Sequence, residues 1–163
     1  MNLRRIYEYA LQRELEGKSF FENNAGRMSH AAVQGIFRRL AEEEQKHVEF
    51  IESLLATLDT GGEIEADITA DLKEGSFFLQ RAKSEMLEQT VTESMVPDLP
   101  ILRMAYLIER DFSEFYEMAA SKAEGDAIQA LTMLAEWERA HERLFKQLHD
   151  QIFEEYTSMP WGG

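Results

Sequence analysis

Two short stretches, residues 40–47 and 134–141, decide the fold because they carry the same pattern. They read Leu40-Ala41-Glu42-Glu43-Glu44-Gln45-Lys46-His47 and Leu134-Ala135-Glu136-Trp137-Glu138-Arg139-Ala140-His141. Each has a glutamate three residues before a histidine, so both side chains lie on one face of a helix. That face is the apolar stripe of its segment, where a charged group needs a partner. The repeated pattern therefore predicts a metal site built from helices.

Apolar residues recur at spacings of three and four through most of the chain, which predicts long amphipathic helices. The first helix is expected from about Leu3 to about Arg27. Ser29 is the expected N-cap of the second helix, which should stop at the run Asp59-Thr60-Gly61-Gly62. The third helix should open at Pro97-Asp98-Leu99-Pro100, because proline is favoured in the first turn of a helix.

The segment between the second and third helices, about 63–97, is too long for a tight turn. It is expected to contain a helix of its own at about 70–93. Gly125 should end the third helix and Asp126 should cap the fourth. A loosely held tail is expected at about 157–163.

The helix order predicts an all-α fold. Two helical pairs with short internal loops, joined by one long crossover between helices 2 and 3, are typical of the ferritin-like four-helix bundle. A length of 163 residues suits a single domain spanning 1–163. Besides the two Glu-His pairs, the inner stripes are expected to include Ile6 and Glu14 on the first helix, Glu109 on the third and Ile128 on the fourth.

The two halves of the chain repeat the spacing of the candidate ligands. Glu14 precedes Glu44 by 30 residues, and Glu109 precedes Glu138 by 29. The six predicted metal ligands are Glu14, Glu44, His47, Glu109, Glu138 and His141. Two nearby cations repel, so the glutamates of the two Glu-x-x-His pairs are expected to bridge them. Each histidine would then bind one ion, and the glutamates of the first and third helices would be terminal ligands.

A single Glu-x-x-His pair can be an ordinary surface pair, and a single glutamate can be assigned to the wrong face of a helix. All six residues together, however, lie on the apolar faces of their helices. Glu16 and Glu114 fall on polar faces and are rejected as ligands. His30 and His149 lack a glutamate three residues before them and are interpreted as surface residues.

Two further residues could support the ligands. Glu43 directly precedes a predicted ligand and could accept a proton from a histidine ring. Tyr116 lies seven residues after Glu109 on the same face and could donate a hydrogen bond to a ligand carboxylate. A packed core tyrosine is the equally simple alternative for Tyr116.

Composition restricts the partners and the metal. The formal charge of −14 makes nucleic acid a poor partner. The chain has no cysteine, so thiolate zinc sites and iron–sulfur clusters are excluded within it, and carboxylate with imidazole suits iron, manganese or zinc. No apolar run is long enough for a membrane span, and the N-terminus has no signal-peptide core. We therefore expect a cytoplasmic protein without a membrane partner.

At these residues the chain resembles the rubrerythrin branch of the ferritin-like superfamily. The motifs that carry the resemblance are Glu14 with Phe21, Leu-Ala-Glu-Glu-Glu44-x-x-His47, Glu109 with Phe115-Tyr116, and Leu-Ala-Glu-x-Glu138-x-x-His141. The resemblance implies a non-haem centre of two iron ions (Fe2+/Fe3+), with zinc or manganese as alternatives in the same site. It also implies reaction with hydrogen peroxide or dioxygen, and often a homodimer.

The chain departs from rubrerythrins at two points. Phe112 stands where their third helix carries the second glutamate of Gly-Glu-x-x-Glu, which argues against a peroxidase cycle that uses that carboxylate. Rubrerythrins also usually bear a cysteine-rich electron-transfer domain, so here a separate electron-donor protein is expected. Three functions stay open: a di-iron oxidoreductase reducing peroxide or dioxygen, an iron-binding ferroxidase related to storage, and a di-iron hydroxylase of an organic substrate. The hydroxylase would use a pocket lined by Phe77, Phe78 and Met86, and the favoured alternative for this segment is that it covers the open side of the bundle.

Overall fold

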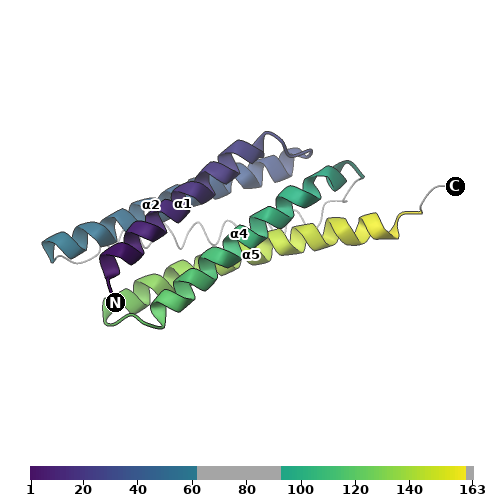
Figure 1. Ribbon diagram of the computed structural model, residues 1–163. Coiled ribbons are helices and arrows are strands. Elements are labelled where there is room, and N and C mark those ends of the chain that lie inside the picture. Colours follow the sequence, from purple (N-terminus) through teal and green to yellow (C-terminus); the bar gives the residue numbers. More distant parts are fainter. Residues whose placement is uncertain (62–92, 161–163) are drawn as a thin grey trace.

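Four long helices form the described part of the chain. The computed structural model describes residues 1–61 and 93–160, which comprise α1 (Leu3–Ala25), α2 (Ala31–Thr60), the short 3-10 helix η1 (Glu93–Asp98), α4 (Leu99–Ala120) and α5 (Asp126–Ser158). Helix α1 packs along α2, and α4 along α5 (Figure 1). The predicted helix at about 70–93, with Phe77, Phe78 and Met86, lies almost wholly outside the described residues.

The second helical pair begins at the opposite end of the bundle from where the first pair ends (Figure 1). Helix α2 ends at one end of the molecule and α4 begins near the opposite end (Figure 1). This order is the one that the sequence predicts, and the all-α bundle is confirmed. Among the described helices, none is both long enough and apolar enough to cross a membrane.

The first loop differs from its prediction. Helix α1 ends at Ala25, and the N-cap of α2 is His30, whose side chain accepts a hydrogen bond from the backbone N–H of Ala32. Ser29, the expected cap, instead bonds a residue far away in the sequence. The expected stop of α2 is correct: Gly61 has a φ of 66° and donates its N–H to the carbonyl of Thr57. Glycine tolerates this left-handed conformation.

The second loop also differs. Helix α4 ends at Ala120, five residues before the expected Gly125, which is instead the residue before α5 with a φ of 60°. Asp126 is the first residue of α5 rather than its cap, so its carboxylate lies at the positive end of the helix dipole. Helix α5 continues to Ser158, so the expected tail begins too early.

One inner-stripe assignment was wrong by one helix position. Ile128 is 45% exposed, while its neighbour Ala127 is buried. Ile6, also predicted to face inward, is half-buried and packs against the core beside the buried Tyr7. The error at Ile128 occurs near a helix end, where few neighbouring turns fix which face meets the core.

The apolar core has two parts, and the predicted ligands lie between them along every helix. One cluster contains the aromatic group Phe21, Phe37 and Phe145, in which the first and third rings stack with centroids 5.4 Å apart. The other contains Tyr116 and Trp137. The order along each helix is therefore apolar cluster, ligands, apolar cluster, which places the polar residues at the middle of the bundle.

Asp98 connects the two helical pairs. Its side chain is 1% exposed and accepts hydrogen bonds from the backbone N–H of Ser29, at 3.0 and 3.2 Å, and from the Ser29 hydroxyl at 2.7 Å. The loop after α1 is thereby attached to the start of α4.

We expect Asp98→Ala to lower the free energy of unfolding by about 1–3 kcal/mol, because the hydrogen bonds that its carboxylate accepts from the N–H and hydroxyl of Ser29 would be lost. Urea denaturation followed by circular dichroism measures this. Ser29→Ala is the matched control and should cost less, since it removes only the hydroxyl donor. Equal costs for the two variants would show that the backbone bond contributes nothing.

Candidate metal centre

All six predicted ligands are buried at the middle of the bundle. Their side chains come from four helices: Glu14 from α1, Glu44 and His47 from α2, Glu109 from α4, and Glu138 and His141 from α5. None is more than 2% exposed. The rejected alternatives Glu16 and Glu114 are exposed, as expected.

The six residues form two groups that overlap. Glu14, Glu44, His47 and Glu138 each offer a ligand atom within 4.8 Å of the others, and so do Glu44, Glu109, Glu138 and His141. The two glutamates common to both groups are those of the Glu-x-x-His pairs. This sharing is the arrangement that two bridging carboxylates would have.

In the first group the ligand atoms contact one another. Nδ1 of His47 lies 3.2 Å from Oε2 of Glu14, a hydrogen-bond contact, and 2.8 Å from Oε1 of Glu138. The Tyr116 hydroxyl donates a hydrogen bond to Oε1 of Glu14. The suggested role of Tyr116 as a donor to a ligand carboxylate therefore fits the structure, although its partner is on α1 rather than α4.

In the second group the ligand atoms lie close together without hydrogen bonds. Nδ1 of His141 lies 3.4 Å from Oε2 of Glu138, 3.5 Å from Oε1 of Glu44 and 3.6 Å from Oε2 of Glu109. Among the described residues, this nitrogen and both oxygens of the three glutamates have no hydrogen-bond partner. Burying such groups unpaired costs several kcal/mol each, so the donor set fits a cation.

Burial and repulsion from neighbouring carboxylates raise the pKa values of the two outer glutamates, which are the predicted terminal ligands Glu14 and Glu109. Burial, followed by the charges of Glu138 and Glu44, raises the pKa of Glu14 well above its ordinary value, and the same causes raise the pKa of Glu109. Burial and the charge of Glu14 also raise the pKa of Tyr116. Both outer glutamates therefore tend to be protonated when no cation is bound.

The pKa values of the histidines and of the shared glutamates shift in opposite directions. Burial lowers the pKa of His47 and His141, but the surrounding carboxylates outweigh it and raise both pKa values well above normal. Burial raises the pKa of Glu44 and Glu138, but the nearby histidines outweigh it, and both pKa values end below normal. The cluster is thus a group of carboxylates that holds positive charge, either as protons or as metal.

The position before each shared glutamate differs between the halves. Glu43 is buried and forms ion pairs with Arg39 at 3.0 Å and Lys46 at 3.9 Å, and in the described structure it makes no contact with a histidine ring. Its counterpart Trp137 stacks on His47 with ring centroids 5.3 Å apart. The sequence gives no sign of this stacking, because the two residues are on different helices.

A close approach of Gly17 to Phe112, beside Glu44, could also not be predicted from the sequence. A Cβ on Gly17 would lie 3.0 Å from the Phe112 ring and 3.5 Å from Oε2 of Glu44. The Arg13 guanidinium carbon lies 4.8 Å from the centre of the same ring. A side chain at position 17 would therefore press on the Phe112 ring, which would have to shift by a few tenths of an ångström.

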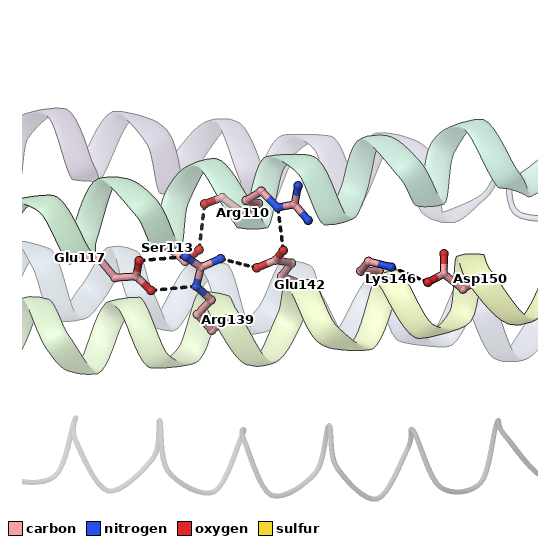
Figure 2. A network of polar contacts seen from close by, with 7 residues as sticks. All are labelled: Arg110, Ser113, Glu117, Arg139, Glu142, Lys146 and Asp150. Atoms are coloured by element: carbon pink, nitrogen blue, oxygen red, sulfur yellow. Dashed lines mark hydrogen bonds and ion pairs between the residues drawn. The ribbon is translucent and has the colours of Figure 1, made fainter.

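An ion-pair network supports the opposite side of α4 and α5 (Figure 2). Arg139 donates to both oxygens of Glu117, at 2.8 and 2.9 Å, and to Glu142 at 2.7 Å, which also accepts from Arg110 at 2.8 Å. Arg110, Arg139 and Glu142 are each the chain neighbour of a predicted ligand. The network therefore fixes the relative positions of α4 and α5 where they carry the ligands.

The two remaining histidines are half-buried rather than on the surface. His30 caps α2, and His149 stacks on Phe153 with centroids 6.0 Å apart and contacts Tyr106 edge-on. Neither lies in the described carboxylate groups.

We expect the free energy of unfolding of the metal-free protein to fall as the pH rises from about 5.5 to 7.5. The folded cluster has raised pKa values for Glu14, Glu109, His47 and His141, so it binds more protons than the unfolded chain, and stability decreases with pH in that case. Carboxyl groups with lowered pKa values, such as Glu44 and Glu138, affect the stability only at pH values below this range. Each additional proton that the folded state holds changes the free energy of unfolding by up to about 1.4 kcal/mol per pH unit.

Urea denaturation in the presence of a chelator, at three pH values, measures this slope. The double variant Glu14→Gln/Glu109→Gln should show a shallower slope, because two of the groups with raised pKa values are gone. Stability that increases with pH in the wild type would contradict the charge distribution described here.

Comparison with known proteins identifies one family. The family model described as rubrerythrin matches residues 5–149 of the chain. No curated protein and no solved structure matches the chain at a significant level.

Proposed function

Because the match covers most of its length, the chain belongs to the rubrerythrin family, and we propose that it is a non-haem di-iron oxidoreductase. It would reduce hydrogen peroxide or dioxygen with electrons from a separate donor protein. The family suggests a di-iron protein, and the observation that carries the proposal is the pair of overlapping carboxylate-histidine groups. Their unpartnered buried oxygens supply the charge that two divalent cations need.

The proposed ligand roles follow from which residues the two groups share. Glu44 and Glu138 would bridge both ions. Each ion would also have one histidine and one terminal glutamate, paired as His47 with Glu14 and His141 with Glu109. When bound, two ferrous ions supply the two electrons that reduce one hydrogen peroxide to water.

The chain's own residues prepare the site. Tyr116 orients Glu14 by a hydrogen bond to one of its oxygens, and Trp137 fixes the ring plane of His47. The buried Phe112 ring and Glu44 both lie against Gly17. Such packing favours a small oxidant over a bulky organic substrate. The pocket considered for a hydroxylase belongs to residues outside the described structure.

The electron donor and the assembly state are also proposals. The chain has no cysteine, so it offers no thiolate iron site that could receive electrons for the centre. A separate donor protein would do so, and the chain would act as a homodimer. Gel filtration that gives a dimer would argue against a storage cage.

Anaerobic ferrous titration of the metal-free protein, followed by one pulse of peroxide or of oxygen, tests the proposal. We expect two ferrous ions per chain, and oxidation of both by one peroxide with ferric absorption. Repeated turnover on addition of reductant would distinguish an oxidoreductase from a ferroxidase, which would accumulate a mineral. Binding of no iron, or of a single ion, would contradict a di-iron function.

Replacing a bridging ligand should remove both ions. We expect Glu44→Ala or Glu138→Ala to abolish tight binding of two ferrous ions, because both ions share these carboxylates. Glu43→Gln is the matched control: it removes a buried charge beside the same site and should retain two ions. Loss of only one ion in Glu44→Ala would show that this residue does not bridge.

A further inference from the structure

The two halves of the centre share ligand types but differ in their hydrogen bonds. On one side Glu14 bonds both His47 and Tyr116. On the other side neither the carboxylate oxygens of Glu109 nor Nδ1 of His141 have a hydrogen-bond partner among the described residues. Phe21 follows Glu14 by seven residues, as Tyr116 follows Glu109, so the two residues correspond in the internal repeat. Phe21 has no hydroxyl and therefore cannot provide the equivalent bond to Glu109.

The His141 side is arranged as a cation site before any ion binds. Three carboxylate oxygens lie 3.4–3.6 Å from Nδ1 of His141, and this nitrogen makes no hydrogen bond within the described structure. Both oxygens of Glu109 are free to face a metal. A cation entering this position breaks no protein hydrogen bond and relieves the cost of unpaired buried charge.

The His47 side has to be rearranged. Nδ1 of His47 is the atom that faces the carboxylates, and it already contacts Glu14 at 3.2 Å and Glu138 at 2.8 Å. One oxygen of Glu14 accepts a hydrogen bond from the Tyr116 hydroxyl, and its other oxygen is the one that contacts His47. A cation here must replace the existing contact between Glu14 and His47, and it gains correspondingly less.

We propose that the two metal positions are unequal: the first ion binds at Glu109 and His141, and the second, more weakly, at Glu14 and His47. This inference rests on the proposed two-metal function. A second ion also meets bridging carboxylates whose charge the first ion has partly neutralised, which adds to the difference.

The matched variants His47→Ala and His141→Ala test the order, because each keeps one metal position without repulsion from a second ion. Cobalt(II) is the probe, and calorimetry with its d–d absorption gives stoichiometry and affinity without oxidation. We expect His47→Ala to bind one ion at least about tenfold more tightly than His141→Ala, a difference of about 1.4 kcal/mol. Equal affinities, or the reverse order, would overturn the proposal.

A second measurement does not depend on how these variants fold. Crystals of the wild type grown with one equivalent of cobalt(II) should show stronger anomalous scattering at the Glu109–His141 position. Equal or opposite occupancies would contradict the proposed order. If the wild type cannot bind two ions at all, the proposed function fails instead, so the two failures are distinguishable.

Tyr116→Phe provides a third test, because it changes only the side with the hydrogen bond. Its effect should appear in the second step of a wild-type cobalt titration and leave the first step within about twofold. A change confined to the first step would show that Tyr116 acts on the tighter position, against the proposal.

Discussion

Four carboxylates buried at the centre of the bundle are the constraint on which the rest of the structure depends. Carboxylates without compensating charge are costly in an apolar interior, yet Glu14, Glu44, Glu109 and Glu138 are all fully buried. Without metal, protons on Glu14, Glu109 and the two histidines compensate this charge. Two divalent cations would replace those protons and balance all four carboxylates. The amphipathic helices pack as a stable bundle only if this charge is matched.

The surroundings of the centre can be understood as support for that arrangement. An apolar cluster lies on each side along the helices and excludes water from the ligands. The Arg139 network holds α4 against α5 on the outer side of the ligands, and Asp98 attaches the α1–α2 loop to the start of α4. Gly17 lies against both the Phe112 ring and Glu44. Each of these contacts connects residues that are distant in the sequence, and together they fix the spacing of the four helices.

The sequence allowed prediction of the helices and the position of all six candidate ligands, because helical periodicity alone places a side chain on a face. A glutamate and a histidine three residues apart on an apolar stripe must both point inward. What could not be predicted depends on contacts between helices. Ser29 looks like a helix cap, but Asp98 binds it instead. Tyr116 was placed on the correct face, while its partner Glu14 lies on another helix. The unequal hydrogen bonding of the two halves follows from such pairs.

Thermal unfolding of metal-free and reloaded protein tests the central claim, that bound cations balance the buried carboxylates. Ferrous iron or cobalt(II) would be added anaerobically at a hundredfold excess over its dissociation constant. Each ion should then stabilise the fold by about 2.7 kcal/mol, which raises the melting temperature of a domain this size by roughly 5–10 °C. Chelation should reverse the increase. A melting temperature that changes neither with chelation nor with reloading would contradict the metal-centred interpretation of the bundle.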